Sequence, residues 1–171
     1  MGSYAEAVRL AQLTGNAPDT ALVRNYSSQP GIALNLEQQI DQNLGVFARA
    51  SLNQGSKEAY EFTEINKSLA VGLALRGTGW GRPQDVFGLA LVANGLSDDA
   101  RAYFAAGGLG ILIGDGQLPN YASEHILETY YSVTFTDWLW LSADYQWIAN
   151  PAHNSDRGPV SIVATRVHVQ Y

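Results

Sequence analysis

The sequence predicts an all-β fold, an antiparallel transmembrane β-barrel, and three features of the chain lead to this prediction. Apolar and polar residues alternate through most of the 171 residues, as they do in strands with two different faces. Only 15% of the residues are charged, against about a quarter in a typical soluble domain. Short and long connections also alternate along the chain, which is typical of barrels with short turns at one rim and long loops at the other.

Eight segments carry the strand pattern. In the last of them, for example, Val163 and Val167 share one side, whereas Arg166 and His168 share the other. The apolar spacing of the first segment also suits a helix. The expected strands are 4–11, 31–40, 44–53, 62–76, 86–94, 126–135, 138–150 and 160–171.

The connection 95–123 is long and is expected to contain a helix over 97–105. Ser97 is a suitable N-cap, and the acidic pair that follows it favours the positive end of a helix. Gly107 and Gly108 would then end the helix. We expect this connection to lie outside the cell and to cover part of a pore or enter it.

Charge and composition exclude several classes of function. The net charge of −6 leaves no basic stripe that would bind nucleic acid. The absence of cysteine excludes disulfides and thiolate chemistry. Met1 is followed by Gly-Ser-Tyr rather than by a signal sequence, so we expect either that a signal was removed or that the chain starts within a longer protein.

Catalytic and cofactor motifs are weak. Gly108, Gly110 and Gly114 are spaced like parts of a dinucleotide loop, but a helix is expected before them where a strand is required. The three histidines lack the spacing of a metal site. Glu124 and Glu128 share a strand face, which a wet surface explains better than a glycosidase pair. We therefore expect no enzyme activity, no cofactor and no metal.

Several short motifs carry a resemblance to a known family, and their order and spacing make the resemblance fairly specific. They are Leu34-Asn35-Leu36-Glu37-Gln38, Phe62-Thr63-Glu64-Ile65, Trp80-Gly81-Arg82-Pro83, Ala105-Ala106-Gly107-Gly108-Leu109-Gly110 continuing to Gly114-Asp115-Gly116, Ile126-Leu127-Glu128-Thr129-Tyr130-Tyr131, Asp144-Tyr145-Gln146, Asn150-Pro151-Ala152 and Asp156-Arg157-Gly158-Pro159-Val160. Together these motifs resemble the carbohydrate-selective porins of Gram-negative bacteria.

The resemblance implies an outer-membrane barrel of about 16 strands with a narrow charged constriction that passes glucose and related sugars. Members of that family are considerably longer than this chain, which is therefore interpreted as the C-terminal half, with about eight of the strands. The missing N-terminal half or a second copy would close the barrel. Outer-membrane lipid, small sugars and the barrel assembly machinery are the expected partners.

Polar residues on the expected inner face are candidates for the sugar path. Arginine offers a fixed set of donors and carboxylates are acceptors, so a mixture of the two suits hydroxyl-rich neutral solutes. The alternative is that these residues only solvate and brace the interior of the barrel. The candidate lumen residues are Glu37, Arg49, Glu64, Asn66, Arg76, Glu128, Asp144, Gln146, Arg166 and His168.

Three aromatic residues, Phe47, Phe62 and Trp140, share the inward parity and are candidates for a slide along which sugars stack. For Trp140 the alternative is a one-residue bulge that turns the ring toward lipid. Other aromatic residues suit the girdle at the membrane interfaces better. These girdle candidates are Phe135, Tyr145, Trp147 and Tyr171.

The leading hypothesis is an outer-membrane porin segment that forms a polar channel for the passive diffusion of sugars such as glucose. One alternative is a soluble all-β sugar-binding domain, which would need no detergent. Another is a small eight-stranded anchor barrel with an interior filled by side chains. Small inward residues such as Gly72 and Gly88 favour a wall beside a wide lumen over a filled interior.

Overall fold

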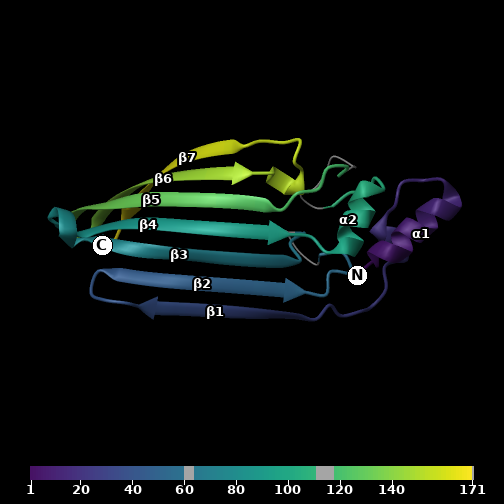
Figure 1. Ribbon diagram of the computed structural model, residues 1–171, viewed down its shortest axis with the longest axis horizontal. Coiled ribbons are helices and arrows are strands. Elements are labelled where there is room, and N and C mark those ends of the chain that lie inside the picture. The colour runs from purple at the N-terminus through teal and green to yellow at the C-terminus, as the bar shows by residue number, and fades with distance from the viewer. Residues whose placement is uncertain (60–63, 111–117, 171) are drawn as a thin grey trace.

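The computed structural model describes residues 1–59, 64–110 and 118–170. Within these residues, seven strands form one antiparallel sheet in which each strand pairs with the next along the chain (Figure 1). The prediction of an all-β antiparallel sheet is confirmed. The strands are β1 (Gly31–Gln39), β2 (Leu44–Asn53), β3 (Lys67–Gly77), β4 (Arg82–Gly95), β5 (Glu124–Thr136), β6 (Leu139–Ala149) and β7 (Val160–Val169).

The pairing register carries the alternation of each strand across the whole sheet. Phe47 of β2 pairs with Gly72 of β3, Gly72 pairs with Ala90 of β4, and Ala90 pairs with Glu128 of β5. Residues in such a row point to the same side because paired residues share a face of the pleat. One face of the sheet is therefore mostly apolar, and the other carries most of the polar residues of the strands. The apolar face includes Leu34, Val46, Val71, Leu89, Leu141 and Val167.

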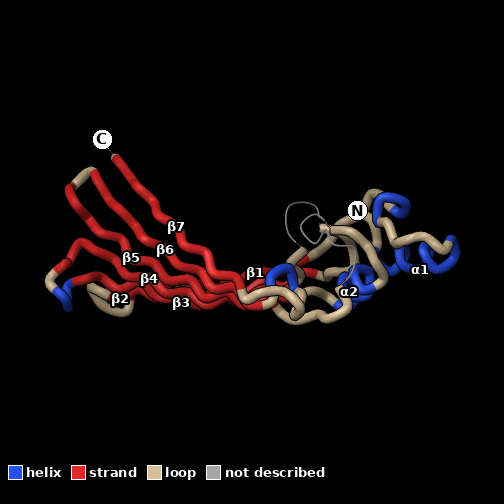
Figure 2. Tube along the Cα trace, turned by 90° about the horizontal axis from the view of Figure 1, so that it is seen from above, coloured by secondary structure: helices blue, strands red, loops and turns tan. Residues whose placement is uncertain are grey.

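The apolar face is largely uncovered. Leu34, Val71 and Val167 are 58%, 42% and 63% exposed. A soluble protein rarely exposes an apolar surface that runs over a whole sheet, whereas a sheet whose outside contacts lipid requires one. Figure 2 shows that the sheet is also curved, with β5, β6 and β7 rising away from β2 and β3 toward the end that carries the turns.

The first segment is a helix, α1 (Tyr4–Thr14), and the prediction of a strand over 4–11 was wrong. Ser3 caps the helix by accepting a hydrogen bond from the Glu6 amide, and Gly15 ends it with a φ of 74°. The buried residues Tyr4 and Ala7 are three positions apart. They share one side of a helix, whereas in a strand they would point to opposite faces.

The buried core lies in a helical layer beyond one end of the sheet, as Figures 1 and 2 show. In this layer α2 (Asp98–Ala105), capped by Ser97 as expected, packs against α1. The ring of Tyr4 lies with its centroid 4.9 Å from that of Tyr103 and 6.0 Å from that of Phe104. Three short 3-10 helices complete the described elements: η1 (Thr20–Val23), η2 (Thr78–Trp80) and η3 (Pro151–His153).

The two ends of the sheet differ in how its strands are connected. The short connections that follow β1, β3 and β5 lie at the end opposite the helical layer (Figure 1). The longer connections lie at the helical end. This sorting agrees with the predicted alternation of short and long connections. Among the described residues, no helix has the length and apolar character needed to cross a bilayer.

Candidate functional site

The polar face of the sheet begins at β1 and β2 with a cluster around Arg49. The Arg49 Nε atom donates to Asn35 Oδ1 at 2.9 Å, and Nη2 donates to Glu37 Oε1 at 3.0 Å. The guanidinium carbon lies 5.1 Å from the centroid of the Phe47 ring. The side chains of Arg49 and Glu37 are 60% and 61% exposed, so their donors and acceptors remain accessible to a solute.

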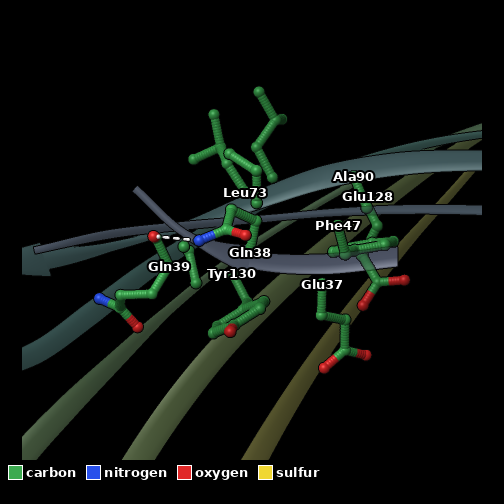
Figure 3. A pocket seen from close by; sticks show the side chains of 12 residues that line it. Glu37, Gln38, Gln39, Phe47, Leu73, Ala90, Glu128 and Tyr130 are labelled. Carbon is green, nitrogen blue, oxygen red and sulfur yellow. Dashed lines mark hydrogen bonds between the residues drawn. The ribbon is translucent and has the colours of Figure 1, made fainter. Parts of the chain in front are cut away.

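In the middle of the polar face, two aromatic rings lie across glycines of neighbouring strands. A Cβ atom built on Gly72 would overlap the ring of Phe47, and one on Gly88 would overlap the ring of Tyr130. Each glycine faces its aromatic residue directly in the register. The absence of a side chain therefore lets each ring approach the backbone closely. Figure 3 shows Phe47 and Tyr130 on the same side of the sheet as Glu37 and Glu128.

Tyr130 was not among the residues predicted for the site. Its sequence context shows only an inward parity on an expected strand, which many residues share. What distinguishes Tyr130 is Gly88 opposite it, and that pairing becomes readable only once the register of β4 and β5 is known.

Strands β5 to β7 carry a second polar cluster. Gln146 Nε2 donates to Glu128 Oε2 at 3.2 Å, and Asp144 faces Tyr130 across the pair β5–β6. Arg166 lies on the same face of β7, opposite Ser142. These side chains line a hollow of about 590 Å³. Glu128, Asp144, Gln146 and Arg166, all predicted for the lumen, are therefore brought together.

Trp140 and His168 share the polar face near the turn end of the sheet. They face each other in the register, with ring centroids 5.1 Å apart. The register irregularity of this strand pair lies in β5, between Thr134 and Thr136, so Trp140 keeps the parity of Ser142. Arg76 also lies on this face, opposite Val86.

Two of the predicted lumen residues, Glu64 and Asn66, lie before the first residue of β3 rather than within the sheet. Glu64 and Asn66 are 6% and 8% exposed and precede β3, which begins at Lys67, so the parity of that strand does not extend to them. Asn66 Oδ1 accepts a hydrogen bond from the Ser97 amide at 2.9 Å, and its Nδ2 donates to Asn53 Oδ1 at 2.9 Å. Asn66 thus ties the start of α2 to the sheet. Phe62 and Tyr171 lie outside the described residues.

A buried carboxylate braces the turn end of β4. Asp85, whose side chain is 2% exposed, accepts from Arg82 at 2.7 and 3.1 Å, from the Tyr131 hydroxyl at 2.8 Å and from the Thr134 amide at 3.0 Å. The Trp80 indole donates to the Tyr131 hydroxyl at 2.8 Å. Trp80 and Arg82, which belong to one of the motifs noted above, therefore fix the turn after β3 to β5.

A second carboxylate ties the N-terminal segment to the connection between β2 and β3. Glu58 accepts from Arg24 at 2.7 and 2.8 Å, from the Thr20 hydroxyl at 2.7 Å and from the Gly2 amide at 2.8 Å. Burial opposes its ionisation, but the hydrogen bonds from Arg24, Thr20 and Gly2 prevail and lower the pKa of Glu58 to about 2. Among the residues that the structure describes, no group of three histidine or acidic side chains is placed to hold a metal ion.

A curved antiparallel sheet with one apolar and one polar face is typical of proteins that span a membrane with β-strands. In such proteins lipid contacts the apolar face and water contacts the polar face. The family is shown directly. The model of the carbohydrate-selective porin family, OprB, matches residues 1–171. The chain belongs to this family of Gram-negative outer-membrane proteins, which are channels rather than enzymes.

A solved structure supports the same fold. The high-pH structure of Pseudomonas putida OprB aligns with a TM-score of 0.73 at 20% sequence identity. The alignment covers 96% of this chain and 40% of that chain, so this chain spans about two fifths of the length of the protein it matches. No curated protein sequence matches the chain.

Proposed function

We propose that the polar face of the sheet lines a channel for the passive diffusion of sugars such as glucose across the outer membrane. The observation that carries this proposal is the separation of the two faces over all seven described strands. A sugar that enters a channel must exchange hydrogen bonds to water for hydrogen bonds to protein. The clusters around Arg49 and around Glu128 offer accessible donors and acceptors of both charges on that face.

The wall of the channel requires more strands than this chain supplies. In the described residues, β1 and β7 each pair with a single strand, and an unpaired strand edge is costly in lipid. We propose a barrel of about 16 strands in which this chain forms part of the C-terminal half. The remaining strands come from the rest of a longer protein or from a second copy. The short turns would lie at the periplasmic rim and the helical layer at the outer mouth.

The two alternative functions fit less well. A soluble sugar-binding domain would have to cover the apolar face, on which Leu34 and Val167 are more than half exposed. A small anchor barrel would need β1 to pair with β7, which are the two ends of the sheet order. It would also need a filled interior, whereas the middle of the polar face carries glycine and alanine.

A pair of adjacent substitutions tests the proposal on protein purified from its own outer membrane. Ala90→Trp adds bulk to the polar face, and Leu91→Trp adds it to the apolar face. In liposome swelling assays, we expect glucose entry with the unaltered protein and with Leu91→Trp, and slower entry with Ala90→Trp. Liposomes that swell no faster in glucose than protein-free liposomes would refute the channel.

A further inference from the structure

We propose that the rings of Phe47 and Tyr130 form a stacking subsite for a pyranose ring, with Glu37 and Glu128 beside them as acceptors for its hydroxyl groups. This inference rests on the proposed function and deepens it. A polar lumen alone would admit any small polyol. A stacking subsite favours cyclic sugars, because these present an apolar C–H face to an aromatic ring.

The two rings converge although they come from strands that are not neighbours. Phe47 belongs to β2 and leans over Gly72 in β3, whereas Tyr130 belongs to β5 and leans over Gly88 in β4. In the register, Gly88 faces Ala74, which is two residues from Gly72. The two glycines are therefore about 5 Å apart across the sheet and about 7 Å apart along it. One small solute can contact both rings.

The glycines set the orientation of the rings. With a Cβ atom at either position the ring would have to lift from the sheet. Without one, the atoms of each ring lie close to the backbone of the neighbouring strand on the polar face of the sheet. Both rings line a hollow of about 470 Å³, together with Glu37, Ala74, Ala90 and Glu128. The small alanines leave space above the sheet where a solute would lie.

Polar groups flank the rings on both sides. Glu37 faces Phe47 in the register, and Glu128 lies two residues before Tyr130 on the same strand face. A carboxylate accepts several hydrogen bonds, so each glutamate matches the hydroxyl groups at the edge of a stacked sugar. This combination of apolar faces and peripheral acceptors fits a hexose better than it fits an inorganic ion.

The two rings are not equivalent. The Arg49 guanidinium lies 5.1 Å from the centroid of Phe47 and competes with a sugar for that ring. Among the described residues, no cation or aromatic contact involves the ring of Tyr130. Tyr130 is therefore the ring to test.

An aromatic side chain over a glycine also has a purely structural use, because it shields the backbone and pins the register. That role predicts a loss of folding when the ring is removed, but no change in the discrimination between solutes of similar size. A readout that compares a cyclic with an acyclic sugar therefore separates the two roles.

The test measures the concentration of glucose that halves the single-channel ion current of protein purified from its native outer membrane. Sorbitol, an acyclic hexitol, is titrated in parallel. We expect Tyr130→Leu to raise the half-blocking concentration of glucose by about two- to tenfold, the range of an aromatic contact, and to leave that of sorbitol unchanged. Tyr130→Phe should retain the block. The control is Tyr145→Leu, on the apolar face, which should behave as the unaltered protein.

If Tyr130→Leu folds and conducts ions but has the same half-blocking concentration of glucose as the unaltered protein, the subsite is overturned. Equal block by glucose and sorbitol in the unaltered protein would overturn it as well. If Tyr130→Leu does not fold, Tyr130→Met keeps the bulk without the ring and must show the same weakening. A complete lack of glucose entry would instead refute the proposed channel.

Discussion

At the scale of single residues, burial decides what a charge contributes. The Arg49–Glu37 pair is more than half exposed on both sides, and exposed pairs contribute about 0–1 kcal/mol. Asp85 is 2% exposed and accepts hydrogen bonds from Arg82, Tyr131 and the Thr134 amide. Removal of Asp85 leaves the partly buried Tyr131 hydroxyl and Thr134 amide without this acceptor, at about 1–3 kcal/mol.

We therefore predict that Asp85→Ala lowers the free energy of unfolding clearly more than Glu37→Ala does. Urea unfolding in lipid vesicles, followed by tryptophan fluorescence, measures both variants under the same conditions. Equal losses for the two variants would show that the buried brace at the turn after β3 contributes no more than an exposed ion pair.

The low pKa of Glu58 makes the attachment of the N-terminal segment dependent on pH. Its folded pKa of about 2 lies below the ordinary value of 4.5. The stabilisation is therefore complete above about pH 4.5 and is lost as the pH falls through that value toward 2. We predict faster amide hydrogen exchange in residues 1–24 at pH 3 than at pH 6, after correction for intrinsic rates. Glu58→Gln should abolish most of this difference, and a full difference in that variant would exclude Glu58 as its source.

At the scale of the strand, the assignment of the two faces has a direct energetic consequence. Val71 lies on the apolar face, opposite Leu91, and Ala90 lies on the polar face, opposite Glu128. An arginine near the middle of the lipid-facing surface costs about 2–4 kcal/mol. We predict that Val71→Arg loses about this much in folding into bilayers, whereas Ala90→Arg loses little because Glu128 can pair with it. A larger loss in Ala90→Arg than in Val71→Arg would show that the two faces are assigned the wrong way round.

The sequence predicted the strands well because a period of two leaves a strong signal in each of them. It was less informative where no such period exists. The apolar spacing of the first segment, which includes Tyr4 and Ala7, suits a helix as well as a strand. The contact of Tyr4 with Tyr103 favours the helix, but these two residues are far apart in the sequence. Glu64 and Asn66 were assigned by extending the parity of β3 beyond its first residue.

The site was predicted in part for a related reason. Parity identifies which residues share a face, so Arg49 and Glu128 were predicted to lie on the same, inner face. Parity gives no information on which residues of different strands lie opposite each other. The positions of Phe47 over Gly72 and of Tyr130 over Gly88 depend on register, which arises from the pairing of whole strands.

At the scale of the whole molecule, the sheet and the helical layer have different tasks. The sheet buries little among its described residues, whereas the compact core of Tyr4, Tyr103 and Phe104 lies in the helical layer. Such a sheet gains its stability from lipid on one side and from closure with further strands. The helical layer is packed independently of lipid and is fixed to the sheet through Asn66 and Ser97, which suits a structure at the mouth of a channel.

The separation of a lipid face from a water-filled face is tested most directly by single cysteines at adjacent positions of β6. The chain has no cysteine of its own, so Ser142→Cys and Ala143→Cys each introduce one thiol, the first on the polar face and the second on the apolar face. Protein in liposomes is treated with a bulky, membrane-impermeant thiol reagent, and glucose entry is measured before and after. We predict that Ser142→Cys is labelled and that its labelling slows glucose entry. Ala143→Cys should not be labelled, and its glucose entry should not change. Labelling of Ala143→Cys with loss of glucose entry, and none at Ser142→Cys, would contradict the assignment of the polar face to a sugar-conducting lumen.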